Sequence, residues 1–242
     1  MTTPLLEVCV PDAESLAAAV IGGAERVELC SGLELGGLTA SPGLMRLAAA
    51  APLRVYALVR PRTGDFVYDG RDIDALLADI DAIRAAGLDG IVIGASRPDG
   101  TLDASLLRRL KDAAGPLGTT LHRAIDLVPD FAAATEIAAD LGFERILTSG
   151  GARAAIDGTR AIRIIHDTAR GRIKVMAGSG LTPANVGTLL DAVPVDEVHS
   201  SCATAMTTRG ADAVRLGFAD PTRRQTDPAV VAEFREVLER FA

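Results

Sequence analysis

Aromatic residues are scarce in this chain. Phenylalanine, tyrosine and tryptophan together make up 3% of its 242 residues, and tryptophan is absent. The volume of the core must therefore come from alanine, leucine, valine and isoleucine, which suits a sheet covered by helices. Hydrophobic residues make up 48% of the chain and charged residues 24%, the composition of an ordinary globular protein long enough to bury a sizeable core.

An excess of basic residues is also missing, since the formal net charge is -7. This charge disfavours nucleic acid or an anionic membrane surface as the main partner. No stretch approaches the roughly 20 apolar residues of a membrane helix, and no basic segment opens the chain. With only 3 cysteines, at least one thiol cannot pair within the chain, which favours a reducing compartment. We expect a soluble cytoplasmic protein.

Short β-rich runs alternate with amphipathic segments rich in alanine and leucine, and this cycle occurs eight times. The expected strands are Leu5–Val10, Arg26–Cys30, Arg54–Val59, Gly90–Gly94, Thr119–Ala124, Arg145–Ser149, Ile173–Ala177 and Glu197–Ser201. Eight strand–helix units in about 250 residues predict a (β/α)₈ barrel, in one domain spanning residues 1–242. A doubly wound open sheet is the alternative, but no GxGxxG motif opens the first helix.

Helix boundaries carry recognisable capping residues. Asp12 is expected to cap the first helix, and Ser41-Pro42 and Thr182-Pro183 to open two later ones. The last strand is followed by a long polar segment, Ala203 to Thr226, which we expect to be a loop over the barrel mouth or at a dimer contact. A final helix is expected from Pro228.

Polar side chains and glycines gather where the expected strands end, which is where barrel proteins place their functional groups. They are Cys9, Cys30, Arg60, Arg62, Ser96, His122, Arg123, Asp126, Ser149, Gly150, Gly151, Gly178, Ser179, Gly180, His199, Ser200 and Ser201. The loops at the opposite end carry no such set. The sequence therefore predicts a functional site at the C-terminal mouth.

A Glu-x-Cys pattern occurs in both the first and the second strand, at Glu7 with Cys9 and at Glu28 with Cys30. Because side chains alternate along a strand, each Glu and its Cys should face the same way. Two carboxylates inside the barrel would raise one another's pKa and form an acid–base pair. Alternatively, they are ion-paired to arginine or lysine and only fill the barrel. We expect their partners among Arg60, Arg123, Lys174, His122 and His199.

Two of the three histidines, His122 and His199, end strands, where they would act as general acid or base or orient a substrate oxygen. The alternative is a satisfied core histidine. His166 falls within a helix and is expected at the surface. Asp126 follows His122 closely and is counted with the candidate catalytic residues, as are Arg60 and Arg123.

Anion binding is predicted after the sixth to eighth strands. Backbone N–H groups of a glycine-rich loop after strand seven, and a helix N-terminus beyond strand eight, suit phosphate. The expected contributors are Arg62, Ser149, Gly150, Gly178, Ser179, Gly180, Ser200 and Ser201. The alternatives are tight turns that need positive φ at the glycines, and surface arginines in "RPRTGDF".

The blocks "LEVC", "GGAERVELC", "GGLTAS", "RPRTGDFVYD", "LHRAID", "RILTSGG", "VMAGSG" and "EVHSSC" resemble, in order and spacing, the CutC copper homeostasis family. The resemblance implies a (β/α)₈ barrel, a cytoplasmic homodimer and a role in copper homeostasis, with Cys9 and Cys30 as Cu(I) ligands. Family members often carry a Cys after "GDF", where this chain has Val67, and read "GGLTPS" where it has Ala40.

The sequence is therefore compatible with two functions. The first is a copper protein that binds Cu(I) through Cys9 and Cys30, although a free Cys is more often a small buried hydrophobe. The second is an enzyme of lyase, isomerase or hydrolase type that acts on a small anionic or phosphorylated substrate. In it Glu7 or Glu28 would be the base, His122 or His199 the acid or electrophile, and Arg60 or Arg123 the anion clamp.

Overall fold

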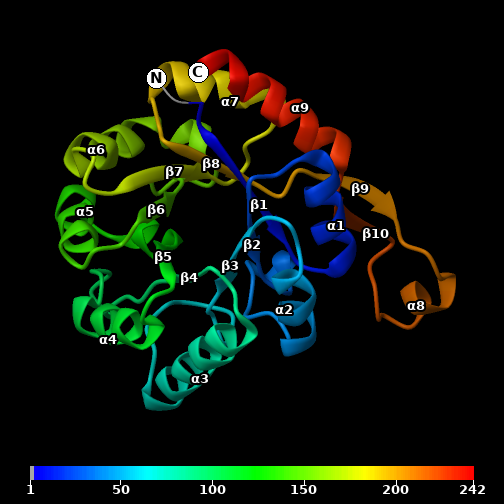
Figure 1. Cartoon of the computed structure of the whole chain (residues 1–242), viewed down its shortest axis with the longest axis horizontal. Helices are drawn as coiled ribbons and strands as arrows, with labels where there is room; N and C mark the ends of the chain where they lie inside the picture. The colour runs from blue at the N-terminus through cyan, green and yellow to red at the C-terminus, as the bar shows by residue number, and fades with distance from the viewer. Residues whose placement is uncertain (1–2) are drawn as a thin grey trace.

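The computed structural model of the chain describes residues 3–242. Eight parallel strands close into a barrel in chain order, from β1 beside β2 round to β8 beside β1 (Figure 1). Their bounds are β1 Leu5–Val10, β2 Arg26–Leu29, β3 Arg54–Leu58, β4 Gly90–Ile93, β5 Gly118–Leu121, β6 Arg145–Thr148, β7 Lys174–Gly178 and β8 Glu197–Ser200. The predicted (β/α)₈ barrel is confirmed, and the open sheet is wrong.

Helices form a ring around the barrel (Figure 1). They are α1 Ala13–Gly22, α2 Pro42–Ala49, α3 Gly70–Ala86, α4 Ala104–Ala114, α5 Phe131–Asp140, α6 Thr159–Ala169, α7 Pro183–Ala192 and α9 Pro228–Leu238. The predicted capping is confirmed at α1, where the Asp12 carboxylate accepts from the Ser15 N–H, and at α2, where Ser41 accepts from Leu44. Within residues 3–242, no helix combines the length and apolar character needed to cross a membrane.

The segment between β8 and α9 is more ordered than the predicted loop. It contains β9 Ala203–Thr207, the short helix α8 Ala211–Arg215 and β10 Thr222–Thr226, with β9 and β10 paired antiparallel. Near its base, Gln225 donates to the Ser15 hydroxyl of α1 at 2.6 Å, and Arg223 pairs with Glu14. The rest projects beside α1, away from the ring (Figure 1).

Several strands end earlier than the sequence predicts, and the largest difference is after β5. The strand stops at Leu121, because His122 becomes the N-cap of a 3₁₀ helix that runs from Arg123 to Leu127. After β6, a 3₁₀ turn at Ala155–Asp157 likewise precedes α6. Both 3₁₀ segments follow the C-terminal ends of strands, at the barrel mouth.

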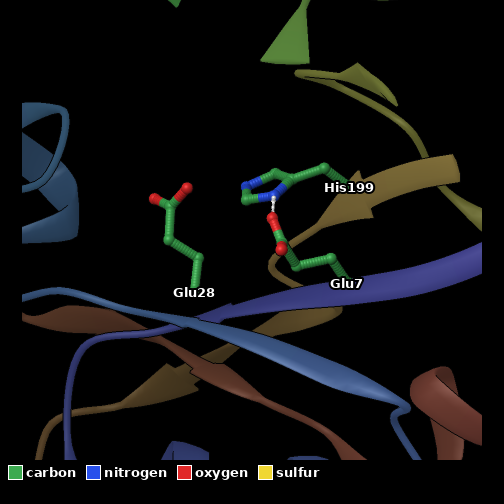
Figure 2. A group of neighbouring side chains, drawn as sticks. All are labelled: Glu7, Glu28 and His199. Carbon is green, nitrogen blue, oxygen red and sulfur yellow. Dashed lines mark hydrogen bonds and ion pairs between the residues drawn. The ribbon is translucent and has the colours of Figure 1, made fainter. Parts of the chain in front are cut away.

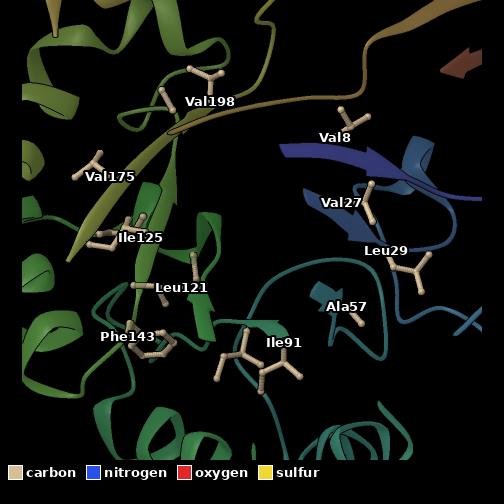
Figure 3. Close-up of a cluster of buried hydrophobic side chains, with 14 of the residues drawn as sticks. Val8, Val27, Leu29, Ala57, Ile91, Leu121, Ile125, Phe143, Val175 and Val198 are labelled. Carbon is tan, nitrogen blue, oxygen red and sulfur yellow. The ribbon is translucent and has the colours of Figure 1, made fainter. Parts of the chain in front are cut away.

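Alternation along the strands separates two kinds of interior. Outward residues such as Val8, Val27, Ile91 and Val198 pack against the helices in a continuous apolar layer (Figure 3). Inward residues are of two kinds. One is a small cluster of Cys30, Tyr56, Leu58 and Val92, and the other is a set of buried charged groups. The fully or nearly buried charged side chains of the barrel strands are Glu7, Arg26, Glu28, Arg145 and Glu197.

Candidate active site

A cavity of about 680 Å³ opens at the C-terminal ends of the strands. Its floor and walls include two thiols, two imidazoles, two carboxyl groups and three guanidinium groups, and residues of α9 border it. The polar and sulfur-bearing lining residues are Cys9, Glu28, Arg60, His122, Arg123, Ser179, Thr182, His199, Ser200, Ser201, Cys202, Arg224 and Glu233. The structure thus brings together residues of β1, β2, β3, β6 and β8 and of the segments that follow β5 and β7, as expected at a barrel mouth.

At the inner end of this cavity, His199 and Glu7 form a hydrogen-bonded pair. Nδ1 of His199 lies 2.9 Å from Oε1 of Glu7 (Figure 2). The second carboxylate oxygen, Oε2, is ion-paired with the Arg26 guanidinium, which also pairs with Glu197 below. Glu7 is 0% exposed, so its charge depends on these two partners. The imidazole is therefore held by Glu7 at Nδ1, and the Cys9 thiol is a second neighbour of the ring.

Glu28 faces the other nitrogen of the ring. In Figure 2 its carboxyl group lies to the left of the imidazole, towards the edge that carries Nε2, while Glu7 lies below the ring. One carboxylate oxygen each of Glu7 and Glu28 and a ring nitrogen of His199 all lie within 4.8 Å of one another. Glu28 is 7% exposed, and its Oε2 has no hydrogen-bond partner among residues 3–242. A buried carboxyl oxygen without a partner is available to a ligand.

The two glutamates have opposite pKa shifts, which corrects the expectation that each raises the other. Burial raises the pKa of Glu28 to about 7, helped by the Glu7 charge and opposed by His199 and Arg26. Burial acts in the same direction on Glu7, but Arg26 and His199 outweigh it and hold that pKa at about 2. Burial by itself would lower the pKa of His199, yet Cys9, Glu7 and Glu28 raise it well above the ordinary value. Near neutral pH the site pairs an imidazolium with a partly ionised carboxyl group.

The second imidazole, His122, is uncharged. Its Nδ1 accepts a hydrogen bond from the Ala124 N–H at 3.1 Å, and Nε2 is buried without a partner in the described chain. Burial and the nearby Arg60 lower its pKa to about 3. The ring packs against Phe66 with centroids 4.5 Å apart. His122 does not pair with either barrel glutamate, in contrast to one of the sequence expectations.

Arg60 lines the cavity, but its guanidinium already holds the loops above the barrel. Nη1 donates to the carbonyl oxygens of Leu35 at 3.1 Å and Gly37 at 2.8 Å, and Nη2 donates to Gly64 at 2.9 Å. Among residues 3–242, Nε has no partner and Nη2 has one N–H beyond its bond to Gly64. The structure therefore shows that Arg60 joins two mouth loops and keeps two N–H groups that a ligand could use.

Arg123 also lines the cavity, whereas three nearby residues that were predicted with it lie outside the cavity. Asp126 accepts from Arg123 at 2.7 Å and from the Ser149 hydroxyl at 2.9 Å, and it receives backbone N–H groups of Ser149 and Gly151. Asp126, Ser149 and Gly150 do not line the cavity. Their hydrogen bonds fix the loop after β6 and the direction of Arg123.

The loop after β7 lies at the cavity wall. Ser179 and Gly180 have φ of 84° and 69°, and their backbone N–H groups have no acceptor among the described residues. The hydroxyls are less available: Ser179 donates to the Arg153 carbonyl and Ser200 to the Leu181 carbonyl, at 2.8 and 2.9 Å. Gly178 is not at the wall. An added Cβ there would lie 2.6 Å from Leu147, which explains the glycine as a close approach.

Two further predicted residues lie outside the cavity. Arg62 is 37% exposed and is engaged by Asp72 at 2.8 Å and Asp65 at 3.2 Å. Cys30 is 0% exposed beneath the cavity, its thiol 3.8 Å from the Val10 carbonyl, and burial raises its pKa. Cys9 does line the cavity. A Cu(I) site needs thiolates, so the buried protonated Cys30 fits this role poorly.

Sequence reasoning missed Arg26, Arg145 and Glu197, which form the ion-paired layer under the site. Arg145 lies 3.1 Å from Glu197, and its guanidinium stacks 4.6 Å from the Tyr56 ring centroid. Of the expected partners of the glutamates, His199 is confirmed for Glu7, and Lys174 lies 3.6 Å from Glu197 instead. These three residues begin strands, whereas functional groups of a barrel are expected where strands end.

Two carboxylates and an imidazole could also hold a hard metal ion. In residues 3–242, Glu7, Glu28 and His199 are the one group of such side chains with suitable spacing. However, both oxygens of Glu7 are already engaged, one of them by the positive Arg26. A cation would have to displace these contacts, so the arrangement is better suited to moving protons.

Comparison with known proteins identifies the family. The model of the CutC family matches residues 4–204. The chain belongs to the CutC family. A family protein CutC of Sinorhizobium medicae is 54% identical over 242 residues, covering 100% of this chain and 99% of that protein. The human copper homeostasis protein cutC homolog is 43% identical over 198 residues, covering 81% of this chain and 72% of that protein.

Solved structures agree with this assignment. A crystal structure of a copper homeostasis protein CutC from Streptococcus agalactiae has a TM-score of 0.78 and 28% identity, covering 82% of this chain and 98% of that one. Phosphoribosylanthranilate isomerase from Thermotoga maritima has a TM-score of 0.57 and 15% identity, covering 98% and 99%. The second likeness shows the barrel fold alone, and the first adds a solved relative within the CutC family.

Proposed function

We propose that this CutC protein is an enzyme that transfers protons on a small anionic substrate bound in the cavity at the barrel mouth. The observation that carries the proposal is the Glu28 carboxyl group, which is buried with no partner for Oε2 among residues 3–242 and faces the Nε2 edge of His199. A buried carboxyl with a pKa near 7 suits a general base or acid at neutral pH. A structural salt bridge would instead have satisfied both oxygens.

Within this proposal the three residues have different roles. Glu7 is the orienting group: it keeps one ring nitrogen of His199 protonated and fixes the direction of Nε2. His199, held positive, is the acid that protonates or stabilises developing negative charge. Glu28 is the base that removes a proton from the substrate. The raised pKa of His199 keeps the ring protonated, and the Glu28 pKa of about 7 leaves that carboxyl group partly ionised near neutral pH, as an acid and a base working together require.

The anionic end of the substrate would lie at the wall after β7. The backbone N–H groups of Ser179 and Gly180 are without acceptors there, and the N-terminal turn of α7, with Pro183 and Ala184, borders the same space. Helix N-termini and consecutive free N–H groups favour anions. Arg123, which also lines the cavity, adds a positive charge fixed by Asp126. These features support a phosphate or carboxylate on the substrate.

The test is a comparison of wild type with Glu28→Gln on a pool of phosphorylated and carboxylated small metabolites in D₂O. Mass spectrometry follows any change of mass or deuterium content. We expect a compound that changes with wild type and changes about 10²–10⁴-fold more slowly with the variant, the range that a general base contributes. If no compound changes with wild type, or both proteins act equally, the proposal is wrong.

Copper binding is the second candidate, and it is supported by the names of relatives and by the position of Cys9 at the cavity. In this form of the proposal Cys9 and Cys30 hold Cu(I) as cargo. Competition with a Cu(I) chelator decides it: Cys9→Ser/Cys30→Ser must bind at least tenfold more weakly than wild type. Equal binding would end the role of these two thiols.

The resemblance also suggests a cytoplasmic homodimer, which we retain as a proposal. Light scattering on the purified full chain measures the assembly directly, and a mass near that of one chain at micromolar concentration would contradict it. Fractionation of the native cells measures the location.

A further inference from the structure

His122 carries a buried polar group that no residue of the described chain satisfies. The side chain is 5% exposed, lines the cavity, and has no hydrogen-bond partner at Nε2. Its other nitrogen, Nδ1, receives the backbone N–H of Ala124 at 3.1 Å. A backbone N–H can only donate, so Nδ1 holds the lone pair and the proton of the neutral ring is on Nε2. The ring lines the cavity and therefore carries a buried N–H donor that no described residue uses.

The ring that carries this donor is fixed in position. Phe66 packs on it, and Gly94 of the adjoining loop leaves the space it needs, since a Cβ there would lie 2.3 Å from Cε1 and Nδ1. The lowered pKa keeps the ring uncharged throughout the pH range near neutrality. A fixed, uncharged donor in a water-poor wall is suited to an oxygen that is neutral in the substrate and becomes negative during the reaction.

Glu28 presents the complementary group in the same cavity: a buried carboxyl oxygen that lacks a donor. A ligand that gives up a proton to Glu28 and accepts a hydrogen bond from His122 would satisfy both groups. A carbonyl compound with a hydrogen on the adjacent carbon does this, because loss of that proton moves charge onto the carbonyl oxygen. A phosphate group would place a full charge on His122 before reaction, where an arginine serves better.

We propose that the substrate is a carbonyl compound with a removable hydrogen on the adjacent carbon, and that His122 donates its Nε2–H to the carbonyl oxygen. This inference rests on the proposed proton-transfer function and names its substrate class. Glu28 takes the proton, the C–H electrons form the C=C bond, and the carbonyl π electrons move to oxygen beside His122. Return of the proton to the same carbon restores the substrate and exchanges its hydrogen. Where that carbon carries a hydroxyl, its O–H proton is given up as the new C=O forms, the first oxygen takes up a proton, and the proton on Glu28 goes to the former carbonyl carbon, so the isomer forms with no oxidant or reductant.

The substrate class is tested by hydrogen exchange in D₂O, followed by proton NMR. The probes are hydroxyketone and hydroxyaldehyde phosphates of three to six carbons and small 2-oxo acids. The matched controls are the corresponding polyol phosphates and 2-hydroxy acids, which lack the carbonyl. We expect enzyme-dependent exchange in at least one carbonyl probe and in no control. Exchange in none of the carbonyl probes overturns the inference.

Two variants test the residue. His122→Leu removes the donor and should slow exchange 10²–10³-fold, the effect of losing one oxyanion donor. His122→Gln keeps an N–H donor and should retain more activity than Leu. Unchanged exchange in His122→Leu overturns the role of His122. The failures are distinguishable: if the metabolite pool shows Glu28-dependent change only in compounds without a carbonyl, the proposed function stands and this inference is wrong.

A measurement without substrate completes the test. In ¹⁵N-histidine-labelled wild type, the His122 ring should show the Nε2–H tautomer and no titration between pH 5 and 8. A proton on Nδ1, or titration near the ordinary value of 6.5, would contradict the geometry on which the proposal depends.

Discussion

Nδ1 of His199 lies 2.9 Å from Oε1 of Glu7, and the two residues are register partners on the neighbouring strands β8 and β1. The direction of the imidazole is thus set by the pairing of two barrel strands rather than by a mobile loop. Arg26 continues the contact on the far side, because it is the register partner of Glu7 on β2. Three adjacent strands therefore hold one ring edge, and the opposite edge faces the cavity.

Removal of Arg26 should be among the most destabilising single changes on the barrel strands. Arg26→Met leaves the carboxylates of Glu7 and Glu197 without their shared partner in a site 0–2% exposed. Loss of one member of a buried ion pair costs about 3–5 kcal/mol. Urea unfolding measures this, with Arg54→Met at the exposed start of β3 as the control, expected within about 0.5 kcal/mol of wild type. A similar small effect at both positions would contradict the buried network.

Glu28 should make the protein less stable as pH rises. Its folded pKa of about 7 lies above the ordinary 4.5, so the native state binds the proton more tightly than the unfolded chain. Stability is then lost between about pH 4.5 and 7, by about 3 kcal/mol at roughly 1.4 kcal/mol per pKa unit. The groups that face Glu28, namely Glu7 on β1, His199 on β8 and Arg26 on β2, oppose or reinforce this shift.

The measurement is urea unfolding of wild type and Glu28→Gln at pH 5 and pH 8. Relative to wild type, the free energy of unfolding of the variant should be higher at pH 8 and should differ little at pH 5. The opposite shift at Glu7 acts below pH 4.5, since a carboxylate held at about 2 loses its contribution only as pH falls towards that value. If the free energy of unfolding of the variant does not rise relative to that of wild type between pH 5 and pH 8, Glu28 is ionised in the native state from pH 5 upward.

Alternation along the strands was sufficient to predict which way Glu7, Cys9 and Glu28 point. The same period of two also places Arg26 inward, two residues before Glu28, so the sequence contained the signal that was missed. It was missed because barrel function gathers at the strand ends, whereas Arg26 begins β2. The ion-paired layer lies one step deeper, and a sequence does not show which buried charges meet across the barrel.

Turn geometry accounts for the other differences. Asp126 and Arg62 have the composition of ligand-binding residues, but each is used locally: Asp126 receives N–H groups from the loop after β6, and Arg62 pairs with Asp65 and Asp72. Such contacts depend on how a loop folds back, which spacing alone does not determine. The pairing of β9 with β10 was equally hidden, since both strands are largely exposed and lack an apolar alternation.

Gly94 should be required for the position of His122. In Gly94→Ala the new Cβ would lie 2.3 Å from the His122 ring, so the ring or the strand must shift, at a cost of about 1–3 kcal/mol. The ¹⁵N shifts of the His122 ring and thermal unfolding report the change. Gly70→Ala, at the start of α3 with nothing within 4 Å, is the control and should be neutral or slightly stabilising. Unchanged His122 shifts in Gly94→Ala would contradict this contact.

Arg60 should control the mobility of the loops over the cavity, because three of its hydrogen bonds end on backbone carbonyls of residues 35, 37 and 64. Arg60→Met removes all three, while the backbone contacts between Thr39 and Arg60 remain. We expect amide hydrogen exchange of residues 32–37 to become about tenfold faster, since the loss of roughly 1.4 kcal/mol of local stability gives that factor.

The matched variant is Arg62→Met, two residues further along the same loop. Its guanidinium binds Asp65, Asp72 and the Val67 carbonyl, so its loss should speed exchange around residues 63–67 and leave 32–37 unchanged. If both variants loosen residues 32–37 equally, the segment responds to general loss of charge rather than to Arg60. A specific effect would instead mean that Arg60 regulates access to the cavity, because Leu33 and Gly36 form part of its wall.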